Sequence, residues 1–182
     1  MDFFVPKDGI VFLIRGIGLW ECKDLALIIC LAVLGLVISA LMVQLATPLT
    51  GIIGANYVFT ILLAIYSSFS LLVYEGRRWK FFFQITLFTL LIFPTYIGGI
   101  AFDLFSKIHL VINAFVGDII FNSIYGIFIK KDRLDLWSIL VTVIFWVFNP
   151  IFGLLVKPFF FPPEFAFRIL DIIYWIMPVI II

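Results

Sequence analysis

Long apolar runs separated by short polar segments fill most of the chain. About 20 residues of α-helix cross the roughly 30 Å hydrocarbon core of a bilayer, so each long run predicts one membrane span. No charged residue occurs from Leu25 to Tyr74, and Pro48 and Gly51 mark where this double-length stretch divides into two helices. The pattern predicts six spans, at residues 25–45, 56–74, 81–102, 108–129, 135–156 and 169–182, with loops at 46–55 and 157–168.

The two ends of the chain depart from this pattern. The apolar run from Gly9 to Trp20 is short and interrupted by Arg15, which is typical of an interfacial helix with Trp20 at the headgroup level. The run at 169–182 is too short to cross a bilayer, so we expect this helix to continue beyond Ile182. The prediction is an all-α protein with an interfacial segment at 1–24 and a single six-helix membrane domain at 25–182.

Prolines inside two of the spans predict irregular helices. Pro94 and the glycine pair that follows it are expected to kink or loosen the third span, and Asn149–Pro150 is expected to break the fifth.

Composition agrees with a membrane protein and excludes several classes. Hydrophobic residues make up 65% of the chain and charged residues 13%, whereas a soluble domain carries about 25% charge. A net charge of +1 from scattered bases argues against a nucleic-acid surface. Cys22 and Cys30 form no CxxC motif or Cys/His cluster, so no disulfide framework, metal site or cofactor is predicted.

Basic residues predict the orientation, because short cytoplasmic loops collect Lys and Arg. Nine bases fall on one side of the predicted membrane and three on the other. The nine are Lys7, Arg15, Lys23, Arg77, Arg78, Lys80, Lys130, Lys131 and Arg133, and the three are Lys107, Lys157 and Arg168. Both termini are therefore predicted to be cytoplasmic in a multi-pass protein of the cell membrane.

The predicted span at 108–129 carries His109, Asn113, Asp118 and Asn122. A carboxylate near the middle of a membrane costs about 2.5–3.5 kcal/mol on insertion scales, so Asp118 should face protein or water and have a partner. At 100° per residue, Asp118 and Asn122 share one face, while His109 and Asn113 lie on nearly the opposite face. The two faces therefore cannot line the same pocket.

Polar and aromatic residues in the outer halves of the spans are the candidates for a binding pocket. Thr142, Trp146 and Asn149 share one helical face, and a second face is shared by Asp171, Tyr174 and Trp175. The predicted substrate-binding set is Asn113, Trp146, Asn149, Asp171, Tyr174 and Trp175, with Asn56 and Tyr96 behind them.

Each candidate also has a structural interpretation. Asp118 and Asn122 fit interhelical hydrogen bonding, which is common within membranes, and His109 fits a solvated position at the membrane boundary. The tryptophans and Tyr174 fit interfacial anchors, and Asp171 fits exposure to outer water.

Signatures of known membrane enzymes are missing from the sequence, so an enzyme is not predicted, and an intramembrane enzyme of an unrecognised class ranks among the alternatives. Gly117–Asp118 occurs without the Tyr-Asp partner motif of intramembrane aspartyl proteases, and one histidine cannot make HExxH. The chain also has no glycine-rich phosphate loop.

Several short segments carry a resemblance to a known family. The Lys23-Asp24-Leu25 approach to the first span, the glycines of 51–54, Arg77–Arg78 and the 113–118 stretch are similar to the substrate-capture (S) components of energy-coupling factor transporters. The resemblance implies capture of a small water-soluble micronutrient, a vitamin or its precursor, from the outer side. It also implies a membrane-embedded coupling subunit driven by ATPase subunits.

Docking to such a coupling subunit needs a surface of small residues. The Ala-x-x-x-Ala repeats that many family members carry in the first helix are absent, and the nearest equivalent is the stripe of Ala32, Gly35 and Ser39, continued by Ala46. Packing of this stripe within the chain is the alternative.

Two other functions remain open from the sequence. A structural or assembly subunit would turn the Asp118, Asn122 and Tyr125 face out of the bundle, whereas substrate capture requires an enclosed cavity in the outer half. An ion path through Asp118 would need further acidic residues at successive depths.

Overall fold

A computed structural model describes residues 21–50, 60–74, 79–97 and 101–156 of the 182-residue chain. Helices form throughout this part, and it contains no strand, so the all-α prediction is confirmed there. The helices are α2 (Cys22–Thr50), α3 (Thr60–Tyr74), α4 (Lys80–Leu91), α5 (Ile108–Ile129) and α6 (Leu134–Val156). The predicted interfacial segment, apart from its last residues, and the predicted span at 169–182 lie outside the described residues.

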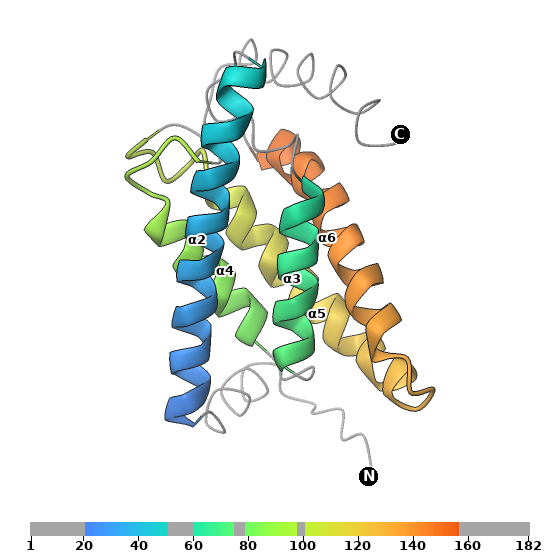
Figure 1. Cartoon of the computed structure of the whole chain (residues 1–182). Coiled ribbons are helices and arrows are strands. Elements are labelled where there is room, and N and C mark those ends of the chain that lie inside the picture. The colour runs from blue at the N-terminus through green and yellow to red at the C-terminus, as the bar shows by residue number, and fades with distance from the viewer. Residues whose placement is uncertain (1–20, 51–59, 75–78, 98–100, 157–182) are drawn as a thin grey trace.

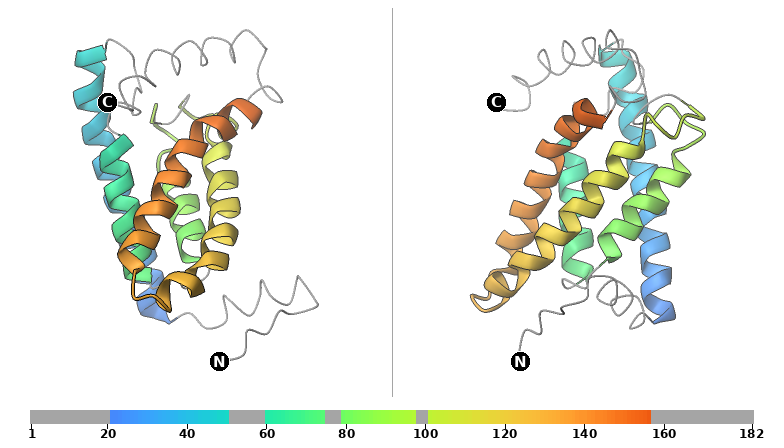
Figure 2. Two further views of the ribbon diagram at one scale, coloured as in Figure 1. Left: turned by 90° about the vertical axis from the view of Figure 1, so that its right-hand side faces the viewer. Right: turned by 180° about the vertical axis from the view of Figure 1, so that it is seen from behind.

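Successive helices run in opposite directions through a bundle (Figure 1). α5 packs on α4 and on α6, α2 packs on α4, and α3 packs on α6. The right panel of Figure 2 shows α2 and α6 at opposite edges of this arrangement. The start of α2, the start of α4 and the turn between α5 and α6 therefore lie at one end, which we call the basic end because Lys23, Lys80 and 130–133 belong to it.

Within the described ranges, two helices are long and apolar enough to cross a membrane: Cys22–Leu45 within α2, and α5. Apolar side chains cover the outside of the bundle as well as its interior, with Leu41, Ile65 and Ile139 more than half exposed. An outer surface of this kind is favourable in lipid, where exposed leucine and isoleucine are in contact with hydrocarbon.

Two helix ends and one expected helix break differ from the prediction. α2 continues through Pro48 to Thr50, so the predicted 46–55 loop begins within α2. α6 likewise continues through Pro150 to Val156 and is not broken there. Proline removes only one intrahelical hydrogen bond, and the flanking helix is long enough to persist in both cases.

The predicted third span is much shorter than expected, because α4 ends at Leu91 and not near residue 102. Pro94 cannot continue a helical ladder, and it disfavours helical backbone at Phe93. The chain instead forms turns in which Thr95 donates its backbone N–H and its side-chain hydroxyl to the carbonyl of Ile92.

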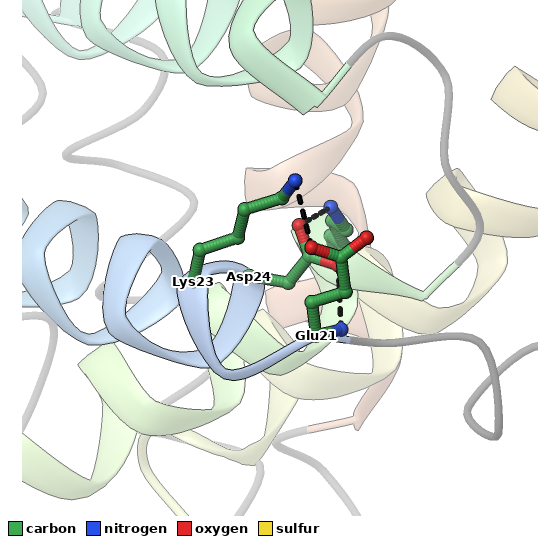
Figure 3. Close-up of polar contacts among 4 residues, drawn as sticks. Glu21, Lys23 and Asp24 are labelled. Atoms are coloured by element: carbon green, nitrogen blue, oxygen red, sulfur yellow. Dashed lines mark hydrogen bonds and ion pairs between the residues drawn. The ribbon is translucent and has the colours of Figure 1, made fainter.

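A buried ion pair joins the start of α2 to the start of α4. Lys80 Nζ lies 2.5 Å from Asp24 Oδ1, and both side chains are almost completely buried. Asp24 also accepts a hydrogen bond from the backbone N–H of Glu21 through Oδ2 at 3.1 Å, as in a helix capping box. Figure 3 shows Asp24 with Glu21 and Lys23 at this helix start.

A second polar group, the Tyr66 hydroxyl, joins three helices in the interior. It donates to the carbonyl of Leu31 in α2 and accepts from Gln84 Nε2 in α4. Gln84 also donates to Ser70 Oγ on α3 at 3.1 Å. These bonds satisfy polar groups that would otherwise cost free energy in an apolar interior.

The stripe of small residues on α2 packs against this tyrosine. A Cβ atom added at Gly35 would lie 2.7 Å from Tyr66 Oη, so only glycine leaves room for the hydroxyl. Ala32 and Ser39 are also buried inside the described bundle. The stripe is therefore covered by the chain's own helices, as the packing alternative requires, and does not present the docking surface predicted for Ala32, Gly35 and Ser39.

The ion pair can be tested by removing one partner or both. Lys80→Met removes the ammonium that balances the buried Asp24 carboxylate, so we expect the free energy of unfolding to fall by about 3–5 kcal/mol. Asp24→Leu should have a similar effect, and the double variant should regain most of the loss. Unfolding titrations in mixed micelles would measure these changes. Lys23→Ala, which removes the exposed Lys23–Glu21 pair, is the matched control and should change stability little.

The Gly35 contact predicts coupling between two positions. Gly35→Ala should destabilise the protein by about 1–3 kcal/mol, because Tyr66 cannot retreat without losing its hydrogen bonds. In a Tyr66→Phe background, the clashing oxygen is gone and the same substitution should cost less. Thermal unfolding of the four proteins measures the coupling, and an equal cost in both backgrounds would contradict it.

Candidate functional site

Asp118 belongs to α5, and its carboxylate lies at the start of the neighbouring helix α4. Its Oδ2 accepts a hydrogen bond from the backbone N–H of Phe82 at 3.2 Å, and its Oδ1 accepts one from Asn122 Nδ2 at 2.5 Å. Phe82 belongs to the first turn of α4, whose N–H groups have no partner within the helix. A carboxylate is favoured there by the free donors and by the helix dipole. The prediction that Asp118 is buried with a partner is confirmed.

The start of α4 is further enclosed by aromatic rings. Trp79 precedes the helix in a left-handed conformation, with φ of 70°, and stacks on Phe115 at 5.6 Å between ring centroids. The Lys80 ammonium lies 5.8 Å from the centre of the Tyr74 ring. Paired charges and packed rings therefore fill the interior of the bundle at the basic end.

Sequence reasoning missed the partnership of Asp24 and Lys80. The pattern of basic residues places Lys80 in a cytoplasmic loop, although its position directly before an apolar run is compatible with burial.

The opposite face of α5 contacts α6. Asn113 Nδ2 donates to the carbonyl of Phe145 at 2.9 Å and lies 3.5 Å from Asn149 Oδ1. Both asparagines are buried, as is Thr142. This agrees with the predicted separation of the two polar faces of α5, since Asp118 bonds to α4 and Asn113 to α6.

A small pocket lies at the centre of the bundle, where all of the described helices meet. It is lined by Gly35, Leu63, Tyr66, Ile85, Phe88, Leu110, Phe145 and Trp146. Trp146 is fixed beside it by a hydrogen bond from Nε1 to Ser67 Oγ at 3.1 Å. Its free space suits roughly one water molecule, and its lining is apolar. Four aromatic rings in such a lining offer stacking surfaces to a planar ligand.

The structure brings together only some of the predicted binding residues. Trp146 lines the pocket, and Asn113 and Asn149 are near it because Asn113 bonds to the carbonyl of Phe145, which is also a lining residue. Tyr96 lies in the irregular segment after α4 and is largely exposed, so it does not line the pocket. Asn56, Asp171, Tyr174 and Trp175 lie outside the described residues.

The pocket offers aromatic and apolar contacts. Across the described ranges, no group of three or more His, Cys, Asp or Glu side chains is arranged to hold a metal ion. The pocket itself offers aromatic rings and apolar surface, with the two asparagines as the nearest amides.

Comparisons of the chain with protein-family models, curated proteins and solved structures find no match.

Asp118 can be tested by two substitutions. Asp118→Leu removes both accepted hydrogen bonds and the charge at the α4 start, so unfolding should become easier by about 1–3 kcal/mol. Asp118→Asn keeps one acceptor oxygen and should cost less. Thermal unfolding in detergent would measure both, with Asp132→Asn in the exposed α5–α6 turn as control. If Asp118→Leu behaves like the control, the carboxylate does not hold α4.

Proposed function

We propose that the protein is a multi-pass membrane protein with six spans and both termini in the cytoplasm. The alternating helix directions support this orientation, because they collect Lys23, Lys80 and 130–133 at one end. Such an accumulation of bases is typical of the cytoplasmic side. The end where α2 and α6 finish would then face outside.

We further propose that the protein captures a small water-soluble micronutrient, as an S component of an energy-coupling factor transporter does. The observation that carries this proposal is the central pocket, which is surrounded by every described helix and lined by four aromatic rings. Three of its lining residues, Leu63 and Tyr66 in the first half of α3 and Leu110 at the start of α5, lie toward the proposed outer end. Uptake would then require a coupling subunit with ATPase subunits as partners.

Capture requires the pocket to widen, because its present space is about that of one water molecule. Trp146 is the side chain best placed to move, since it is only partly buried and is held by a single hydrogen bond to Ser67. A nutrient ring in its place would stack on Phe88 and Phe145, and the nearby Asn113 would supply polar contacts.

The alternative of an assembly subunit has less support. It requires Asp118, Asn122 and Tyr125 to face away from the bundle, yet Asp118 is buried against α4. Tyr125 packs edge-on against Trp137 of α6 with 5.0 Å between ring centroids. The polar face of α5 is thus engaged within the chain.

Ligand capture predicts a molecule that co-purifies and a change in stability. We expect mass spectrometry of the purified protein to identify a small aromatic nutrient. The same compound at 100 times its dissociation constant should stabilise the protein by about 2.7 kcal/mol. Trp146→Ala should weaken binding at least about tenfold, because it removes a stacking wall.

Val147→Ala is the matched control, since Val147 is adjacent in sequence but faces outward. It should leave the ligand-induced shift in melting temperature unchanged. If no small molecule co-purifies and a panel of vitamins leaves the melting temperature unmoved, substrate capture is refuted.

A further inference from the structure

The connection between α4 and α5 is held together by its own polar groups. The backbone N–H of Phe102 donates to the carbonyl of Phe93 at 2.9 Å. Lys107 Nζ donates to the carbonyls of Phe93 and Thr95, at 3.1 and 2.6 Å, and is completely buried. Because Lys107 binds both carbonyls, it ties the beginning of this connection to its end.

In this connection polar side chains are buried and apolar side chains are exposed, which is the reverse of an ordinary surface loop. Surface loops turn polar groups to water, but here Ser106 and Lys107 are buried. The side chains that point outward are apolar or aromatic. Their exposed fractions are 61% for Tyr96, 71% for Phe102, 43% for Leu104 and 50% for Phe105, and we call these four residues the apolar rim.

Phe102 reaches its outward position at a cost in backbone strain. Its φ is 58°, in the left-handed region that bulky residues rarely adopt. The Phe93 ring contacts it edge-on at 5.9 Å between centroids and supports this conformation. Strain of this kind, of order 1–3 kcal/mol, persists where surrounding structure requires it and is a reason to look for a role.

The surroundings of the rim favour lipid as its partner. In Figure 1 and in the right panel of Figure 2, the connection projects from the side of the bundle at the end opposite the basic end. α5 continues the exposed apolar surface toward the basic end with three side chains, Phe115, Ile119 and Ile120. Aromatic residues at the ends of membrane helices prefer the level of the lipid headgroups.

We propose that the apolar rim inserts into the headgroup and upper acyl region of the outer leaflet. This rests on the membrane orientation given under the proposed function. Asp103, partly buried, is the charged residue beside the rim, and Lys107 is withdrawn into the loop, where burial lowers its pKa. Among the described residues, no exposed cation adjoins the rim, so the rim suits a zwitterionic lipid such as phosphatidylcholine.

A fluorescent label at the rim tests this placement. In a protein with Cys22 and Cys30 replaced by serine, Phe102→Cys and Leu104→Cys would each carry a bimane label in phosphatidylcholine nanodiscs. Asp132→Cys in the α5–α6 turn is the water-exposed control. Lipid spin-labelled high on its acyl chain should quench the rim labels on the order of twofold more than the control label. Aqueous iodide should quench the control label more.

Other outcomes overturn the proposal. Iodide quenching of both rim labels to the level of the control would place the rim in water. Protection from iodide without quenching by spin-labelled lipid would indicate a protein partner, such as a second copy of the chain. Addition of phosphatidylglycerol should leave lipid quenching unchanged, and an increase would contradict the absence of exposed cations.

These results are independent of the test of substrate capture. A rim label in water together with a co-purified nutrient refutes only the lipid contact. A rim label in lipid with no bound nutrient refutes only capture. Labelling of Asp132→Cys by a membrane-impermeant thiol reagent in vesicles of known orientation reports the membrane orientation separately.

Discussion

The start of α4 is fixed inside the bundle by two carboxylates from neighbouring helices, and the packing of the described helices depends on this arrangement. Asp118 of α5 accepts a hydrogen bond from the first turn of α4, and Asp24 of α2 forms an ion pair with Lys80. A helix start without such partners would leave free N–H groups in an apolar interior, at a cost of about 1–3 kcal/mol for each. The same contacts set how α2, α4 and α5 pack.

The two ends of the bundle differ as a consequence. Charged groups and stacked rings fill the interior at the basic end, where paired charges require a fixed geometry. Toward the other end, the interior is aromatic and apolar around the central pocket, and Asn113 and Asn149 are its closest amides. Apolar contacts are not directional, so they fix the geometry of this part of the interior less tightly than an ion pair does.

Hydrophobic pattern and helical spacing predicted the class of fold and the burial of Asp118, because both follow from local rules. They also predicted that Asn113 and Asp118 face different neighbours, since these residues lie five positions apart on α5. The partner of Asp118 was not predictable, because a backbone N–H carries no signature in the sequence. Nor was the end of α4 at Leu91, since an apolar run after Pro94 resembles a continuing helix.

Gly35 shows why a site of this kind is difficult to recognise from sequence. Small residues on an apolar helix indicate a close approach of another element, but they do not indicate which one. In the structure, the element is the Tyr66 side chain, and the pocket lies beside this contact. Gly35 thus both permits this close packing and lines the pocket. A larger side chain at position 35 would displace the Tyr66 hydroxyl, which links α2, α3 and α4. The Tyr66 bonds therefore tie the α2, α3 and α4 walls of the pocket to one another, whereas the α6 wall is joined to α3 by the bond from Trp146 Nε1 to Ser67 Oγ.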